Sequence, residues 1–435
     1  MQLTSVSIVG LHGALSLNVD LNKDITLLVG INGSGKTSVL NVIDWLLKPD
    51  MRQLAVATYK SLSLSFKQGD VSYVLTAAKS DISVSLSLAG DHVALKPITI
   101  KLDRHIDPDD EEATEAYAML RPEKHERPMW NLLKSFPRPT TISLDRSISA
   151  ESDDIDYIET SRGIMRRRTR IQSPLSYVQQ ITSEKYAEFR SKAIVNDAEL
   201  KTEIVVSALQ DPDIDLDGTS VKAMTDSEIL LLEQKVVAYL TGTVKSKNVE
   251  NQIRNFFSSS RVLTTSKQSR KQHDLLLDFV TARYRQIERL AKAFNEFEKN
   301  NAVAFKALNE YLSAVNRFFR DSNKELYFDE GTGKLVFSFS DNIKNERISR
   351  GIEHLSSGER QILILFTFLN FASQTQGVFV VDEPELSLHP KWQYEFMETF
   401  LSLRPKGTQL LLATHSPDIV GRYKDACVSL QSARV

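Results

Sequence analysis

Two kinds of hydrophobic spacing follow each other near the start of the chain. Residues 25–29 form a short apolar run that ends in glycine, which predicts a buried strand. Residues 35–47 then carry apolar side chains at helical spacing and stop before a proline; they are Val39, Leu40, Ile43, Leu46 and Leu47. A strand, a glycine turn and a helix are therefore expected in that order.

The rest of the chain alternates between sheet-like and helical patterns. Residues 58–102 alternate polar and apolar positions with turn signals between the runs, which predicts an antiparallel sheet. Residues 140–144 look like a further core strand. Apolar residues recur every three or four positions between 275 and 320, which is typical of an amphipathic helix or a short antiparallel coiled coil. Alternation returns near 326–339, and from residue 351 the pattern is helix, strand, helix, strand.

Composition and charge narrow the class of protein. The chain has 435 residues, 41% hydrophobic and 25% charged, as in a protein with one large or two to three modest domains. A net charge of −2 gives no global basic excess, so any contact with DNA must come from a local patch. A single cysteine excludes an internal disulfide and favours a reducing, cytoplasmic setting. We find no secretion signal and expect no membrane span.

The glycine turn carries the first candidate chemistry. Residues 30–37 read Gly-Ile-Asn-Gly-Ser-Gly-Lys-Thr, a complete phosphate loop between the predicted strand and helix. Backbone N–H groups of such a turn cradle phosphates at a helix N-terminus. Lys36 is expected to reach the β- and γ-phosphates and Thr37 to coordinate Mg²⁺. The nucleotide-binding residues predicted here are Asn32, Gly33, Ser34, Gly35, Lys36, Thr37 and Ser38. A coincidental glycine turn is the alternative, which the flanking strand and helix disfavour.

A second apolar run, residues 378–381, ends in Asp382 and Glu383. Asp382 is expected to hold Mg²⁺ through water, and Glu383 to orient or deprotonate the attacking water. The alternative is a buried strand that ends in a solvated acidic turn. That alternative loses weight because the phosphate loop is present in the same chain.

A serine- and glycine-containing helix start precedes this run, at residues 355–361 (Leu-Ser-Ser-Gly-Glu-Arg-Gln). Such a start can bind an anion, although the same residues also make a plain helix cap. Its order, just upstream of Asp-Glu-Pro, resembles the signature motif of ABC ATPases. The resemblance implies that Ser356, Ser357, Gly358 and Glu359 bind the γ-phosphate held on a second copy. His415, after the run at 410–414, resembles the switch histidine, and residues 385–390 resemble the D-loop.

The resemblance implies an α/β fold: an ABC-type P-loop ATPase head, with a parallel core sheet and an antiparallel β subdomain, interrupted by a helical or coiled-coil insertion. We expect the two halves of the head at 1–150 and 323–435 and the insertion at 151–322. ATP and Mg²⁺ are the implied cofactors, with Lys36, Glu383 and His415 as catalytic residues. The glutamine expected after a strand in the first half is not evident. Arg146 stands where OLD-like proteins often have a basic residue.

The runs at 382–390 and 413–417 are similar to those of OLD-like ATPases, which include the ATPase subunits of the PARIS and Septu anti-phage systems. More distantly, the pattern resembles RecF- and SMC-type heads. OLD nucleases carry a C-terminal Toprim domain, whereas this chain ends soon after His415, so a nuclease or toxin effector is expected to be a separate polypeptide. The basic run at 166–170 could meet DNA, or could be a solvated face paired with nearby acids.

Three functions follow from these patterns. The leading hypothesis is an ATP-hydrolysing sensor or scaffold, dimeric or of higher order, that controls a defence effector. The rival is a DNA-binding ATPase of repair or recombination, of RecF or SMC type. The third is a nucleotide-locked assembly scaffold without significant turnover.

Overall fold

The computed structural model describes residues 1–90, 95–103, 110–142, 148–149, 157–160, 163–166, 173–209, 225–243, 247–262, 273–341, 346–373, 377–430 and 433–434. The chain forms two compact units. We name residues 1–186 and 309–435 the head and residues 187–308 the arm. Two long helices, α5 (Pro174–Leu209) and α8 (His273–Phe319), each run through both units.

A six-stranded sheet forms the centre of the head, in the order β17-β3-β16-β15-β8-β9. The strands in this order are Cys427–Ser429, Ile25–Val29, Gln409–Thr414, Val378–Asp382, Thr140–Ile142 and Ile148–Ser149. All neighbours are parallel except β8 and β9. Every residue of β15 and β16 is buried, which explains why both read as continuous apolar runs. The single cysteine, Cys427, is half-buried on β17.

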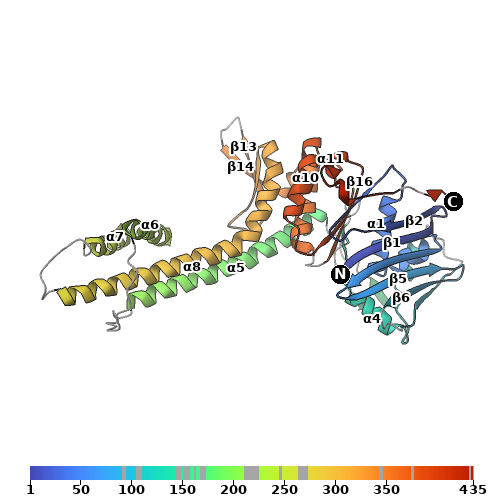
Figure 1. The fold of residues 1–435 in the computed structure, drawn as a ribbon, viewed down its shortest axis with the longest axis horizontal. Coiled ribbons are helices and arrows are strands. Elements are labelled where there is room, and N and C mark those ends of the chain that lie inside the picture. Colours follow the sequence, from blue (N-terminus) through green and yellow to red (C-terminus); the bar gives the residue numbers. More distant parts are fainter. Residues whose placement is uncertain are drawn as a thin grey trace. The chain divides into compact units, whose positions relative to one another are not determined.

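A second, antiparallel sheet has the order β18-β2-β1-β4-β5-β6-β7 (Figure 1). Its strands are Ala433–Arg434, Leu15–Asp20, Gln2–Leu11, Ser61–Gln68, Val71–Lys79, Ser83–Gly90 and Ile98–Lys101. The leucines and phenylalanine of β4 are buried while its serines are half-exposed, so the sheet has one apolar face. The alternation at 58–102 thus corresponds to β4–β7.

Helix α1 (Lys36–Leu47) lies between the two sheets, since it contacts β15 and β16 on one side and β1, β4 and β5 on the other. Its buried residues join the head's main core. Gln409, which is 2% exposed, ties the sheets together through its side-chain amide. The amide accepts from Leu3 N at 2.7 Å and donates to Leu3 O at 2.9 Å and Asn22 O at 2.7 Å.

Smaller elements complete the head. A three-stranded antiparallel sheet contains β12 (Lys324–Phe328), β13 (Leu335–Asp341) and β14 (Glu346–Gly351). The helices are α2 (Met51–Val56), α3 (Glu111–Ala118), α4 (Arg127–Ser135), α9 (Ser357–Thr367), α10 (Pro390–Ser402) and α11 (Pro417–Val420). A hairpin of β10 (Tyr157–Thr160) and β11 (Gly163–Arg166) lies in a segment where the sequence predicts helix.

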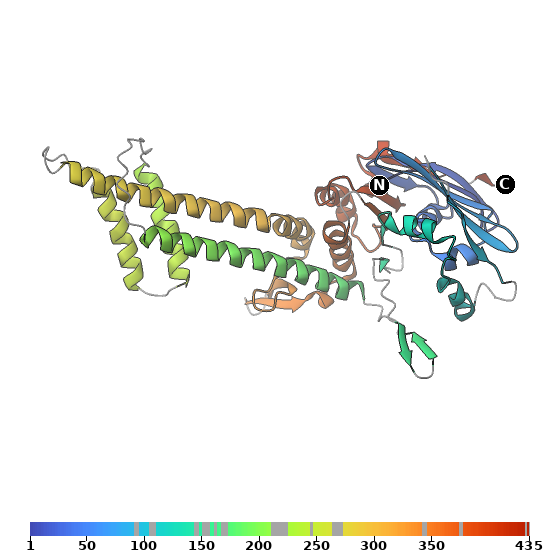
Figure 2. The same cartoon turned by 90° about the horizontal axis from the view of Figure 1, so that it is seen from below.

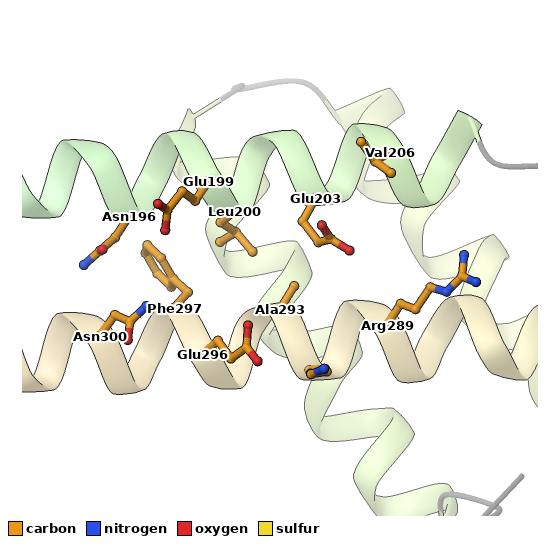
Figure 3. Close-up of a pocket in the computed structure, with 11 residues that line it drawn as sticks. Asn196, Glu199, Leu200, Glu203, Val206, Arg289, Ala293, Glu296, Phe297 and Asn300 are labelled. Atoms are coloured by element: carbon orange, nitrogen blue, oxygen red, sulfur yellow. The ribbon is translucent and has the colours of Figure 1, made fainter.

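In the arm, α5 and α8 run side by side in opposite directions, and α6 (Asp226–Thr243) and α7 (Lys247–Val262) cross them (Figure 2). One apolar cluster joins all four helices, with Leu200, Val236, Phe257 and Phe294 among its members. Polar residues of α5 and α8, including Asn196, Glu203 and Arg289, line a cavity of about 560 Å³ between the two helices (Figure 3). The helix expected at 275–320 is therefore α8, paired antiparallel with α5.

None of the described helices is long and apolar enough to cross a membrane. Arg146 and most of the basic run at 166–170 lie outside the described residues. The compact arm begins at residue 187 and ends at 308, well inside the insertion expected at 151–322, because both long helices continue into the head.

Candidate functional site

Three loops meet at the carboxyl edge of the parallel sheet. In the sheet register, Val29 of β3 pairs with Thr414 of β16, and Asp382 of β15 pairs with Ala413. Strands β3, β16 and β15 therefore end at the same level. The phosphate loop, His415 and Glu383 each follow one of these strand ends, at the edge where parallel α/β sheets bind ligands.

The phosphate loop turns directly from β3 into α1. Asn32 and Gly33 are exposed in the turn, whereas Ser34 is buried. Gly35 precedes the first helical residue with a φ of +94°. A Cβ at this position would lie 2.8 Å from Leu17 and 2.9 Å from Leu15, so both backbone conformation and space require glycine. The helix N-terminus that follows, which includes Thr37 and Ser38, directs its free N–H groups toward this turn.

Lys36 is folded back over the loop. Its Nζ donates to the backbone oxygens of Gly30 at 3.1 Å and Ile31 at 3.3 Å, and the residue is 5% exposed. Burial lowers the pKa of Lys36, and the carboxylates of Glu383, Asp382 and Glu385 oppose that decrease. The loop thus contains a held ammonium group that faces three acidic residues.

Asp382 is buried at the end of β15, 7% exposed. The Thr37 hydroxyl donates a hydrogen bond to its carboxylate, which joins the two residues predicted to bind the metal. Burial raises the pKa of Asp382, with Glu383 adding to the rise and the hydrogen bond from Thr37 opposing it. One carboxylate oxygen, Oδ1, has no hydrogen-bond partner among the described residues. A buried carboxylate in this state is suited to a cation.

Glu383 and His415 face each other across the strand ends. The Glu383 carboxylate Oε1 lies 3.6 Å from His415 Nε2. Glu383 has a φ of +48°, a left-handed conformation that is rare for a residue other than glycine. Its N–H donates to Ala413 O at 2.9 Å, and this bond anchors the strained residue to the neighbouring strand. The structure brings together the two side chains that the sequence placed near the γ-phosphate.

Glu385 holds the His415 loop, a role that the sequence analysis missed. Its Oε1 accepts from Thr414 Oγ1 at 2.8 Å, from His415 N at 2.6 Å and from Ser416 N at 3.1 Å. Gln393 of α10 adds a bond from Ser416 Oγ at 2.6 Å. The sequence signal was only an acid two positions after Glu383, and its partners lie about 30 residues away, at the end of β16 and in the loop that follows.

The predicted signature residues start α9. Ser356 caps this helix: its Oγ accepts from Glu359 N at 3.4 Å, and the Glu359 carboxylate accepts from Ser356 N at 2.8 Å. Ser356 and Ser357 are exposed and Gly358 is buried. Glu359 is 2% exposed, so its carboxylate points into the protein and supports the cap. The Glu359 carboxylate is therefore turned away from the surface on which the sequence predicts a nucleotide contact, and only its backbone could make that contact.

The residues at the strand edge fit a nucleoside triphosphate with a divalent cation. Four buried side-chain oxygens among the described residues have no hydrogen-bond partner, and three of them lie in these loops: Ser34 Oγ, Asp382 Oδ1 and Glu385 Oε2. The fourth, Gln68 Oε1, is at the end of β4. Polar atoms buried without partners cost free energy unless a ligand or water satisfies them. A hydroxyl, an ammonium, a carboxylate and a helix N-terminus are the groups that bind Mg²⁺ and phosphates together.

Glu385→Ala is expected to loosen the His415 loop. Three hydrogen bonds to one carboxylate oxygen are lost, including those from the His415 and Ser416 amides. We expect these two amides to exchange hydrogen at least about tenfold faster, as measured by hydrogen-exchange mass spectrometry. Glu385→Gln, which keeps an acceptor oxygen, should show a smaller effect. Glu395→Ala, on the exposed pair with Arg317, is the control; unchanged exchange in Glu385→Ala would contradict the assignment.

Asp382→Asn is expected to stabilise the protein without metal or nucleotide at neutral pH, by about 1 kcal/mol, because it removes a buried, partly unpaired charge. A raised pKa means that the folded state disfavours the carboxylate, so the wild type regains stability as the pH falls through that pKa toward 3.8. The difference between the two proteins in urea unfolding should shrink on acidification. Asp321→Asn is the control and should destabilise the protein at neutral pH. Lys391 and Trp392 lower the pKa of Asp321, so the folded state favours its carboxylate.

Comparison with known proteins gives a family match over nearly the whole chain. The model of the AAA ATPase domain family matches residues 1–420. Over 167 residues the chain is 27% identical to the Retron Ec83 probable ATPase of Escherichia coli, which covers 34% of this chain and 31% of that protein. It is also 27% identical over 155 residues to the Old nuclease of Escherichia phage P2, covering 31% of this chain and 26% of the nuclease.

A third relative is the UvrABC system protein A of Malacoplasma penetrans, 23% identical over 257 residues, which cover 54% of this chain and 26% of that protein. The matched regions thus span only 26% to 31% of the length of these three relatives. Among solved structures, the Smc head domain with an extended coiled coil from Pyrococcus furiosus, bound to the C-terminal domain of ScpA, aligns with 99% of this chain and 94% of that chain, with a TM-score of 0.38 and 14% identity.

The family match and the strand-edge geometry agree on a P-loop head. The relatives include the Old nuclease, which confirms the resemblance to OLD-like proteins. The chain belongs to the AAA ATPase domain family, and about a third of it is similar to the Old nuclease of Escherichia phage P2.

Proposed function

We propose that this protein hydrolyses ATP at sites that two copies complete together, and that it serves as the sensor or scaffold subunit of a prokaryotic anti-phage defence complex. In that role it controls a separate nuclease or toxin effector. The observation that carries the ATPase part is the meeting of Lys36, the pair Thr37–Asp382 and the pair Glu383–His415 at one sheet edge.

Each residue at this edge has a separate role in the proposed hydrolysis. Lys36 and the N–H groups of the loop bind the phosphates, and Thr37 and Asp382 hold Mg²⁺. The bound cation supplies charge compensation for the phosphate oxygens. Glu383 orients the attacking water and takes its proton. His415 is held in place by Glu385 and lies beside Glu383. From there its ring would donate a hydrogen bond to the γ-phosphate of a bound nucleotide.

The surface around the site supports completion by a second copy. Ser356 and Ser357, at the start of α9, expose their side chains. Two large apolar side chains in the site loops are also exposed, Ile31 at 82% and Leu386 at 38%. A second copy that completes the site would cover these two side chains, and the burial of their apolar surface would favour the association. The resemblance to ABC signature motifs favours a second copy of this chain as that protein.

The defence role rests on the OLD-like branch. The matches to a retron ATPase and to the Old nuclease of a phage favour this branch. This branch includes the ATPase subunits of the PARIS and Septu systems, which the runs at 382–390 and 413–417 resemble. The rival role in DNA repair would need a basic surface that binds DNA. The basic run at 166–170 lies mostly outside the described residues, so the structure does not support that role there.

Glu383→Gln is expected to bind ATP, to dimerise and to stay dimeric while ATP is bound, because the amide cannot take a proton from water. Turnover should fall by roughly 10²–10⁴-fold. The mass of the purified protein, measured by light scattering with and without ATP and Mg²⁺, should double only with nucleotide. Lys36→Ala is the control that should stay at the mass without nucleotide. A monomer in every condition would rule out the composite site, and equal slow turnover in wild type and Glu383→Gln would favour a scaffold that does not hydrolyse.

The defence proposal is tested by phage challenge of cells that carry the chain with the genes beside it. The wild type should reduce plaque formation, because nucleotide-dependent states control the effector. Lys36→Ala should abolish this protection. Gln180→Ala should keep it, because Gln180 is exposed and its side chain bonds to Glu184, one helical turn away. Equal plaque counts for wild type and empty cells over a broad phage panel would count against a defence role.

A further inference from the structure

The C-terminal end of α8 packs against the signature helix inside the head. The Phe318 ring contacts the rings of Phe366 on α9 and Trp392 on α10, with centroid distances of 5.5 and 5.8 Å. Two turns earlier in α8, the buried Tyr311 hydroxyl bonds to Thr367 Oγ1 at 2.7 Å. Helices α8, α9 and α10 therefore share one packed interior in the head.

Beyond the end of α8, two residues reach the cap of α9. The Glu359 carboxylate accepts from Ser322 Oγ at 2.7 Å, from Lys324 Nζ at 2.8 Å and from Ser356 N at 2.8 Å. Burial works against ionisation of Glu359, but these bonds together lower its pKa. Lys324 is the cation paired with this buried carboxylate among the described residues. The ionised Glu359 thus depends on Lys324.

The same junction is bonded to α10, which follows the site loop. Asp321 accepts from Lys391 Nζ at 2.6 Å and from Trp392 Nε1 at 2.9 Å. Gly358 packs closely against this region: a Cβ there would lie 2.6 Å from Ser387 O and 3.5 Å from Trp392. The start of α9 can therefore move only if the junction at residues 321–324 moves with it.

We propose that Lys324 is a positioning residue for ATP-dependent pairing: through Glu359 it fixes Ser356 at the start of α9 and couples this signature segment to the end of α8. The proposal rests on the composite site argued above. Lys324 touches neither the phosphate loop nor the strand edge of its own chain in any described contact. Its effect is therefore expected on the pairing of two copies and not on nucleotide binding by one.

The physical reason is the burial of Glu359. Without Lys324, a carboxylate that is 2% exposed loses its paired charge. A buried unpaired charge either takes up a proton or turns toward water. Both responses weaken the acceptor that holds Ser356 N, so the cap and its exposed hydroxyl lose their fixed position. Two copies would carry two such damaged caps.

The test measures ATP-dependent pairing in the Glu383→Gln protein, in which turnover does not consume the nucleotide. The protein concentration for half-maximal dimer with ATP and Mg²⁺, from sedimentation, should rise about tenfold in Lys324→Met, since two caps are weakened at once. Lys324→Arg keeps a hydrogen-bond donor and the positive charge, so its half-maximal concentration should lie close to that of the parent protein. Arg347→Met removes an exposed ion pair with Glu325 on the same small sheet and should change nothing.

Binding of a fluorescent ATP analogue to dilute monomer should stay within about twofold of the parent in Lys324→Met, which separates positioning from general unfolding. If Lys324→Met fails to fold, Ser322→Ala removes a neutral donor to the same carboxylate and should raise the half-maximal concentration about threefold. A Lys324→Met protein that folds and pairs like its parent would overturn the proposal. If the Glu383→Gln protein itself does not pair with ATP, the composite site fails first and Lys324 has no pairing to position.

Discussion

The parallel register of β3, β16 and β15 is the constraint on which the head depends. Because these three strands end at one level, the loops that follow them lie next to one another. The buried amide of Gln409 fixes the same arrangement from the opposite end, by bonding the first strand of the antiparallel sheet to the middle of the parallel one. Helix α1 fills the space between the sheets and carries the phosphate loop at its start.

Much of this edge could be predicted from sequence because its signals are local. A parallel strand in the centre of a sheet reads as a mostly apolar run, as in residues 25–29 and 378–381, and a phosphate loop requires glycine where the backbone turns. The order of strand, loop and helix therefore fixed Lys36, Thr37, Asp382 and Glu383 as candidates. The order of the strands could not be predicted from the sequence, because it depends on crossover connections that leave no local pattern.

The parts that the sequence missed depend on pairs of side chains from distant segments. Glu385 clamps the His415 loop, and Lys324 pairs with Glu359; neither pair has a local pattern. Glu359 shows the difficulty well. Its place in the motif suggested a contact with nucleotide, whereas its burial turns the carboxylate inward to hold the helix cap. The hairpin of β10 and β11 escaped prediction because each strand has only four residues, with its apolar residues next to each other instead of alternating with polar ones.

The isolated thiol of Cys427 offers a chemical handle on this architecture. It lies on β17, which pairs with β3, the strand that leads into the phosphate loop. Burial raises the pKa of the thiol, so the reactive thiolate is scarce and alkylating reagents should modify it slowly. The chain contains no other cysteine. A serine at this one position would leave a background without thiols, on which dyes or spin labels attached at chosen exposed sites could report distances within the head.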